Sequence, residues 1–113
     1  MSKHSLKDYQ EFSAERFTKR IIFNEGGSTA FMLNFEPGQK LPEHKHSGSE
    51  VYLLVLSGSG TAIIGGEEIE MNAQDVVHSG GDTELAIVNS GSEQMSVYVV
   101  LSKTPNEEYA KNI

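Results

Sequence analysis

The chain has 113 residues, a formal net charge of −7 and a pI near 5.0. Such a charge repels phosphate backbones, and the sequence has no basic stripe with interleaved aromatic residues, so nucleic-acid binding is not expected. Cysteine is absent, which excludes disulfides, thiol catalysis and thiolate metal sites. Residues 1–10 lack the apolar core of a signal peptide, and no stretch is long and apolar enough to cross a membrane. A cytoplasmic protein is therefore expected.

Most of the chain is predicted to form short strands. Apolar residues alternate with polar ones or run together over a few positions, and glycine-rich turns separate these segments. The glycines of Gly65-Gly66 can adopt the positive φ that a two-residue hairpin turn requires. Segment 51–56 is a continuous apolar run, which predicts a strand buried on both faces. The expected strands cover residues 16–24, 29–35, 51–56, 61–64, 67–71, 75–78, 84–88 and 94–102.

The two ends of the chain differ from this pattern. Residues 5–12 could form a short turn of helix. Thr104, Pro105 and Glu107 are typical of a helix start, with Thr104 as the N-cap, so a short C-terminal helix is expected there. Closely spaced strands indicate an all-β sandwich or barrel. The prediction is a single domain over 1–113, with a barrel core at about 16–103 and short extensions at both ends.

The candidate site is a polar segment that contains two histidines. His44 and His46 are two residues apart, so on an extended backbone both imidazoles project from the same face. Glu50 shares their parity if the strand continues through the turn around Gly48. Two imidazoles and one carboxylate could hold a divalent transition metal such as iron, manganese, nickel, copper or zinc. On spacing alone, a solvated loop in which neither histidine has a partner is equally open.

Segments 38–58 and 72–91 resemble the two motifs of the cupin superfamily. The first motif, G-x5-H-x-H-x3or4-E-x6-G, is matched without gaps by Gly38, His44, His46 and Glu50, and Gly58 follows one residue later than the pattern has it. The second motif is matched at Asp75, Val77, Asn89 and Gly91. The resemblance implies a double-stranded β-helix, or jelly-roll barrel. It also implies a pocket for a small molecule, with His44, His46 and Glu50 as metal ligands.

Two departures from the cupin pattern affect this ligand set. The family's third histidine stands four residues before Asn89, and that position is Leu85. Seven residues separate Glu50 from Gly58, where the pattern has six. Measured back from Gly58, the carboxylate position is Val51. Either a β-bulge absorbs the extra residue and Glu50 still points inward, or the carboxylate ligand is lost.

Further side chains are expected near the pocket. Leu85 and Ile87 share a parity and predict an apolar wall. Tyr52 is expected to line the barrel interior or a dimer surface. His78 could supply a compensating ligand from a neighbouring strand, or it could be a strand histidine that faces solvent.

Two classes of function remain open on the sequence. The first is a metal-dependent enzyme, for which the resemblance implies dioxygenase, isomerase or epimerase types of reaction. The second is a metal-free, non-catalytic barrel that binds a small ligand or serves as a dimeric interaction module. A homodimer is expected in either case, because exposed edge strands can pair across a two-fold axis.

Overall fold

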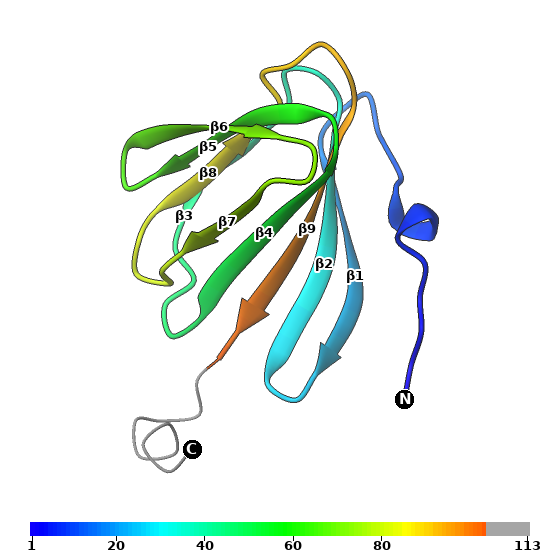
Figure 1. The fold of residues 1–113 in the computed structure, drawn as a ribbon, viewed down its shortest axis with the longest axis vertical. Helices are drawn as coiled ribbons and strands as arrows, with labels where there is room; N and C mark the ends of the chain where they lie inside the picture. The colour runs from blue at the N-terminus through cyan, green and yellow to red at the C-terminus, as the bar shows by residue number, and fades with distance from the viewer. Residues whose placement is uncertain (104–113) are drawn as a thin grey trace.

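The structure is a computed structural model that describes residues 1–103. These residues form one short 3-10 helix and nine strands (Figure 1). The elements in chain order are η1 (Leu6–Tyr9), β1 (Thr18–Glu25), β2 (Ser28–Phe35), β3 (Lys40–His44), β4 (Glu50–Ser57), β5 (Ser59–Ile64), β6 (Glu67–Asn72), β7 (Val76–Ser79), β8 (Leu85–Val88) and β9 (Met95–Ser102).

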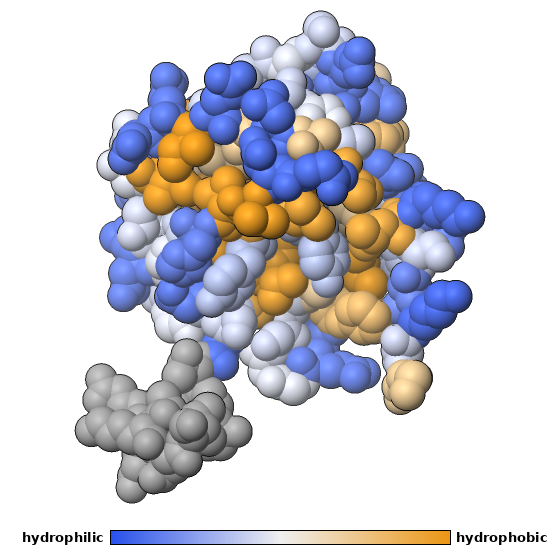
Figure 2. Space-filling view, viewed as in Figure 1, coloured by the Kyte–Doolittle hydropathy of each residue, from blue (hydrophilic) through white to orange (hydrophobic). Residues whose placement is uncertain are grey.

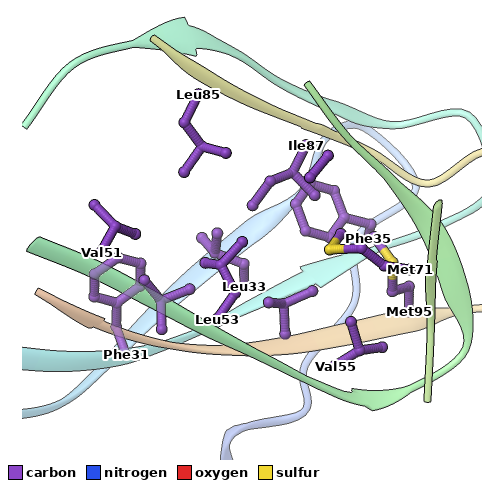
Figure 3. Packing of buried hydrophobic residues seen from close by; sticks show 13 residues of the cluster. Phe31, Leu33, Phe35, Val51, Leu53, Val55, Met71, Leu85, Ile87 and Met95 are labelled. Atoms are coloured by element: carbon purple, nitrogen blue, oxygen red, sulfur yellow. The ribbon is translucent and has the colours of Figure 1, made fainter. Parts of the chain in front are cut away.

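The strands form two antiparallel sheets, with the orders β1-β2-β9-β4-β7 and β3-β8-β5-β6. The hydrophobic core lies between them. Figure 3 shows Leu85 and Ile87 from the smaller sheet facing Leu33, Val51 and Leu53 from the larger one. This arrangement confirms the predicted all-β fold, a jelly-roll barrel.

The predicted alternation of side chains along β2 is confirmed. Phe31, Leu33 and Phe35 point into the core. Met32 and Asn34 lie on the outer face of the sheet, yet both are fully buried. Their cover is the N-terminal extension, which includes η1. The Asn34 side chain donates a hydrogen bond to the Tyr9 carbonyl at 2.8 Å, and the Gln10 amide donates to Ser96 Oγ at 3.2 Å.

The predicted hairpin turn and the second-motif asparagine both have structural roles. Gly65 and Gly66 have φ values of +58° and +85°, which a side chain would oppose. Asn89 is fully buried, and its amide donates to the carbonyls of Phe35 at 3.0 Å and Glu93 at 2.8 Å. The Asn89 side chain therefore fixes the turn between β8 and β9 to the end of β2.

Other motif residues also stabilise turns. The Gly38 N–H donates to the Asn89 carbonyl at 2.8 Å. Asp75 Oδ2 accepts a hydrogen bond from the Asn72 N–H at 2.7 Å, which closes the turn between β6 and β7. Gly58 lies between β4 and β5, where a Cβ would collide with the main-chain oxygen of Gln94. These residues of the motif hold the barrel together rather than line its cavity.

The structure departs from the sequence expectations at strands β4 and β3. Strand β4 is not buried on both faces, because Val51 and Leu53 are buried while Tyr52 is 48% exposed. Strand β3 was not predicted, since its sequence is mostly polar. The helix expected at 104–107 falls outside the described residues. Among residues 1–103, no helix has the length and apolar character needed to span a membrane, and the cytoplasmic location stays a prediction.

Candidate functional site

A cavity of about 100 Å³ lies between the two sheets. Its walls are mainly apolar: Leu85 and Ile87 come from β8, and Phe31, Val51 and Leu53 come from the opposite sheet (Figure 3). The polar groups in its lining belong to Lys19, His44 and His46. The two predicted histidines and the predicted apolar wall are therefore brought together in one cavity.

Two main-chain contacts position the histidines. His44 is the last residue of β3, and its Cα is paired with that of Leu85 in the β3–β8 ladder. His46 follows in the next turn, where its N–H donates to the Gly81 carbonyl at 2.9 Å. The two imidazoles meet edge to face, with their centroids 4.4 Å apart and their Nε2 atoms 2.7 Å apart.

The hydrogen bonds of the pair define its tautomers. His44 Nδ1 lies 2.9 Å from the Pro42 carbonyl oxygen, which can only accept, so this nitrogen carries a proton. In the neutral pair, His44 Nε2 is then the acceptor, and His46 Nε2–H is the donor. The remaining ring nitrogen, His46 Nδ1, has a lone pair in this state. The hydrogen bonds thus run in one direction: His46 donates to His44, and His44 donates to the Pro42 carbonyl.

The polar end of the cavity has a positive bias. Burial lowers the pKa of His46, and the nearby charges of His44 and Lys19 lower it further. The Lys19 ammonium lies 4.5 Å from the centroid of the Phe31 ring, a cation–π geometry. Among the described residues that line the cavity, none carries a carboxylate. Lys19 is itself exposed to solvent, so it stands at the open side of the cavity, where a negative charge on a ligand would meet a cation.

Glu50 does not point into the barrel with the histidines. Its Oε1 lies 2.7 Å from His78 Nε2, and its Oε2 accepts a hydrogen bond from the Gly81 N–H at 3.4 Å. The hydrogen bond with His78 is the main cause that lowers the pKa of Glu50. Both side chains are about half exposed. The predicted role of Glu50 as a metal ligand is thus corrected, and of the two alternatives for its direction the structure supports the loss of the carboxylate. Strands β4 and β9 stay in register from Glu50 to Val55, which turns Val51 inward and Glu50 outward.

His78 and Tyr52 also lie outside the barrel cavity. They are paired across β4 and β7, and their ring centroids are 5.2 Å apart. Of the two interpretations of His78, the structure supports the strand histidine that faces solvent. The predicted placement of Tyr52 in the barrel interior is corrected, because its side chain shares the outward parity of Glu50.

The cavity offers two donors to a metal ion, the Nε2 atoms of His44 and His46. Two imidazole nitrogens at about 2.0–2.1 Å from one ion would lie about 3 Å apart, close to the 2.7 Å between the Nε2 atoms of His44 and His46. The further family ligand positions are Val51 and Leu85, which offer only carbon. In the part of the chain that the structure describes, no three His, Asp or Glu side chains are grouped to hold a metal. These residues do not fit a metal centre with three or four protein ligands.

Lys19 and Gly81 belong to the site although the sequence did not single them out. Lys19 shares the inward parity of Phe17 in the alternating segment 16–24, which was the available signal. Gly81 had no such signal, because its contacts come from the turn at 46–49. There, a Cβ on Gly81 would collide with the main-chain oxygens of His46 and Ser49.

We expect Gly81→Ala to destabilise the fold. The added methyl group meets main-chain oxygens that can move only if both turns shift, which costs about 1–3 kcal/mol of unfolding free energy. Gly80→Ala is the matched control, because its Cβ would find Thr83 Oγ1 at an ordinary 3.8 Å. Urea unfolding of both variants measures the difference. Equal stability of the two variants would show that the contact at Gly81 is unimportant.

The fold and the cavity define a class of protein, a small β-barrel with a cavity between its two sheets. The chain belongs to the cupin family: the family model described as the Cupin domain matches residues 31–101, more than half of the chain.

Similar proteins agree with this assignment. The chain is 32% identical to Auxin-binding protein 1 of Arabidopsis thaliana over 84 residues, which cover 66% of this chain and 42% of that protein. The structure of TT1209 from Thermus thermophilus is similar with a TM-score of 0.86 at 21% identity, covering 93% of this chain and 100% of that one. An RmlC-like cupin from Desulfovibrio desulfuricans has a TM-score of 0.80 at 24% identity, covering 90% and 96%. The two solved structures support the fold alone.

Proposed function

We propose that this cupin binds a small organic carboxylate in its barrel cavity. The carboxylate would lie between the Lys19 ammonium and the histidine pair, and the rest of the ligand would contact the apolar walls. The observation that carries the proposal is the composition of the cavity, in which one cation and two imidazoles stand at one end of an otherwise apolar lining. Small-molecule sites commonly combine apolar walls with a few polar groups that fix orientation.

Charge favours an anionic ligand. The chain as a whole carries a net charge of −7, yet the cavity presents Lys19 without a carboxylate among the described lining residues. The pKa of His46 is lowered mainly by burial, and the charges of His44 and Lys19 lower it further. An anion would offset the charge of Lys19, and a protonated His46 could then donate from Nδ1. A cationic ligand would meet repulsion from Lys19.

Size limits the apolar part of the ligand. A cavity of about 150 Å³ accommodates benzene and a water molecule occupies about 30 Å³ of liquid, whereas this cavity measures about 100 Å³. The buried part of the ligand should therefore have roughly four or five non-hydrogen atoms. Leu85 and Ile87 would contact this part from one sheet, and Val51 and Leu53 would contact it from the other.

The relative supports a small ligand in general terms. Auxin-binding protein 1 is named for binding a small molecule, and the chain spans 42% of its length. The carboxylate class proposed for this chain comes from its own cavity residues. No reaction is assigned, because the histidine pair lacks the further donors that a catalytic metal centre of this family would use.

A titration followed by NMR or calorimetry tests the proposal. Butyrate should bind saturably and shift resonances of the cavity residues, while butyramide, of the same shape but neutral, should bind much more weakly. Equal binding of the two, or no binding of either at millimolar concentrations, would refute it. Butyrate affinity should be unchanged by EDTA. A loss of affinity with EDTA would instead favour the metal-dependent reading, with an ion held through His44 and His46.

A further inference from the structure

A second, shallow hollow of about 400 Å³ lies on the outer face of β4, β7 and β9. Its lining is almost entirely apolar and includes Tyr52, Leu54, Val76, Tyr98 and Val100. Val76 is 76% exposed and Tyr52 is 48% exposed. In Figure 2 a band of hydrophobic residues crosses the middle of the molecule, where Figure 1 draws β4, β7 and β9. An exposed apolar area of this kind usually marks an interaction surface.

The outward side chains of the hollow form two rows that cross the three strands. The pairing of neighbouring strands gives Val100, Tyr52 and His78 as the first row and Tyr98, Leu54 and Val76 as the second. Outward residues of one strand are two positions apart, so the two rows are separated by about 6.6–6.8 Å. A segment that covers the hollow must therefore present apolar side chains at about this spacing.

Strand β9 ends beside the hollow. Its last residue, Ser102, is paired with Glu50 and shares the outward parity of Val100. Ser102 thus stands one row before the first row of the hollow, and the second row is about 13–14 Å away from it. Residues 104–113 could span about 33 Å if extended. The segment that follows β9 is therefore long enough to return over both rows.

The sequence of residues 104–113 has the pattern of an amphipathic helix. The helix start predicted at Thr104 places residues four positions apart on one face, which groups Pro105, Tyr109 and Ile113. The opposite face carries the charged side chains, which are Glu107, Glu108 and Lys111. A helix with one apolar stripe of this kind is stabilised by packing that stripe against an apolar surface.

We propose that residues 104–113 form a helix that docks into the hollow, with Tyr109 over the first row and Ile113 over the second. Four helical residues rise about 6.0 Å, which is close to the spacing of the rows. The charged face of the helix then points to solvent, and the exposed side chains of Tyr52 and Val76 become covered.

The attached segment has an advantage over a separate molecule. Because residues 104–113 follow β9 almost directly, their effective concentration at the hollow is about that given by a short flexible linker, in the millimolar range. A second copy of the chain would have to approach against a net charge of −7 on each molecule. The segment of the same chain is therefore the occupant that the position and the charge favour.

Paramagnetic broadening of NMR signals in the full chain tests the proposal. The sequence has no cysteine, so Lys111→Cys gives one attachment site for a nitroxide label, on the charged face of the helix. The label should remove most of the amide signal intensity of Leu54 and Val76. If the strongest losses fall instead on Glu50 and Thr29, which are paired with the last residues of β9, the segment is not docked and the proposal is overturned.

Two matched pairs of variants, each carrying the same label, show whether the broadening depends on the proposed contact. Tyr109→Ser interrupts the apolar stripe and should restore the Leu54 signal, whereas Glu108→Ser on the charged face should leave it broadened. Val76→Lys should also restore the Leu54 signal. Ile21→Lys should not, since Ile21 is 55% exposed but lies on β1, at the opposite edge of the sheet. Equal behaviour within either pair would overturn the proposal.

A mixture of two chains identifies the molecule that supplies the segment. Isotope-labelled wild type is mixed with spin-labelled Lys111→Cys chain that carries no isotope label. The amide signals of Leu54 and Val76 should keep their intensity in this mixture. A loss at these residues would show that the segment comes from a second copy, and would overturn docking within one chain. If another protein or another surface of a second copy covers the hollow, the label in the same chain will not broaden these signals.

Discussion

Replacing Val51 with Glu and Leu85 with His in one chain is expected to create a divalent-metal site in the barrel cavity. Both residues line the cavity together with His44 and His46, and the Cα of Leu85 is paired with that of His44. They stand where the cupin motifs place the carboxylate and the third histidine. With four ligands in place of two, zinc or nickel affinity should rise about 100-fold or more, since even the loss of outer-shell partners costs about 10–100-fold.

Calorimetric titration with zinc measures this gain. The control is Tyr52→Glu with Leu85→His, which adds the same two groups but places the carboxylate on the outer face. This control should bind zinc more weakly than the double variant in the cavity. The metal-free double variant should also unfold at a lower temperature than the wild type, because Val51 is only 1% exposed and a buried carboxylate is costly without a partner. Zinc should restore the loss. If the double variant binds zinc no more tightly than the wild type does, the side chains at positions 51 and 85 do not reach the same ion as His44 and His46.

Lys19→Met is expected to abolish most of the preference for a carboxylate ligand. Methionine keeps a long apolar side chain against Phe31 but removes the ammonium. A hydrogen bond to a charged group contributes about 1.5–3 kcal/mol, so butyrate affinity should fall about 10- to 100-fold. Butyramide affinity should change little, because the neutral amide gains nothing comparable from the charge. The same titration used for the wild type measures both affinities.

Arg20→Met is the matched control for the lysine variant. Arg20 is the next residue of β1, and its guanidinium donates to Glu11 at 3.0 Å outside the barrel cavity. The Arg20→Met substitution removes one positive charge from the same strand without changing the lining of the cavity. Butyrate binding should be preserved. If both variants lose butyrate affinity equally, the effect comes from the net charge of the chain, and Lys19 does not contact the ligand.

The fold could be predicted because the sequence has a strong two-residue period and clear turns. Alternation alone places Phe31, Leu33 and Phe35 on one face, and the glycines at 65–66 require a hairpin. Strand β3 could not be recognised in this way. Three of its five residues are Lys40, Pro42 and Glu43, and its extended form depends on pairing with β8.

The site could be predicted only in part. His44 and His46 lie two residues apart, and the structure brings both into one cavity. The direction of Glu50 could not be derived, because a turn at 47–49 separates it from the histidines and parity cannot be counted through a turn. Its direction is fixed instead by the register of β4 with β9. Lys19 was missed for a different reason: it is exposed to solvent, as charged residues in alternating strands usually are, and only the folded structure shows that it also lines the cavity.

The main-chain hydrogen bond from His46 to Gly81 has a kinetic consequence. It joins the turn after β3 to the turn after β7, so this side of the cavity rim can open only when both turns separate. The His46 amide proton is protected from exchange by that same bond. The hydrogen-exchange rate of this amide therefore reports how often the two turns separate. A ligand that fills the cavity should slow this exchange.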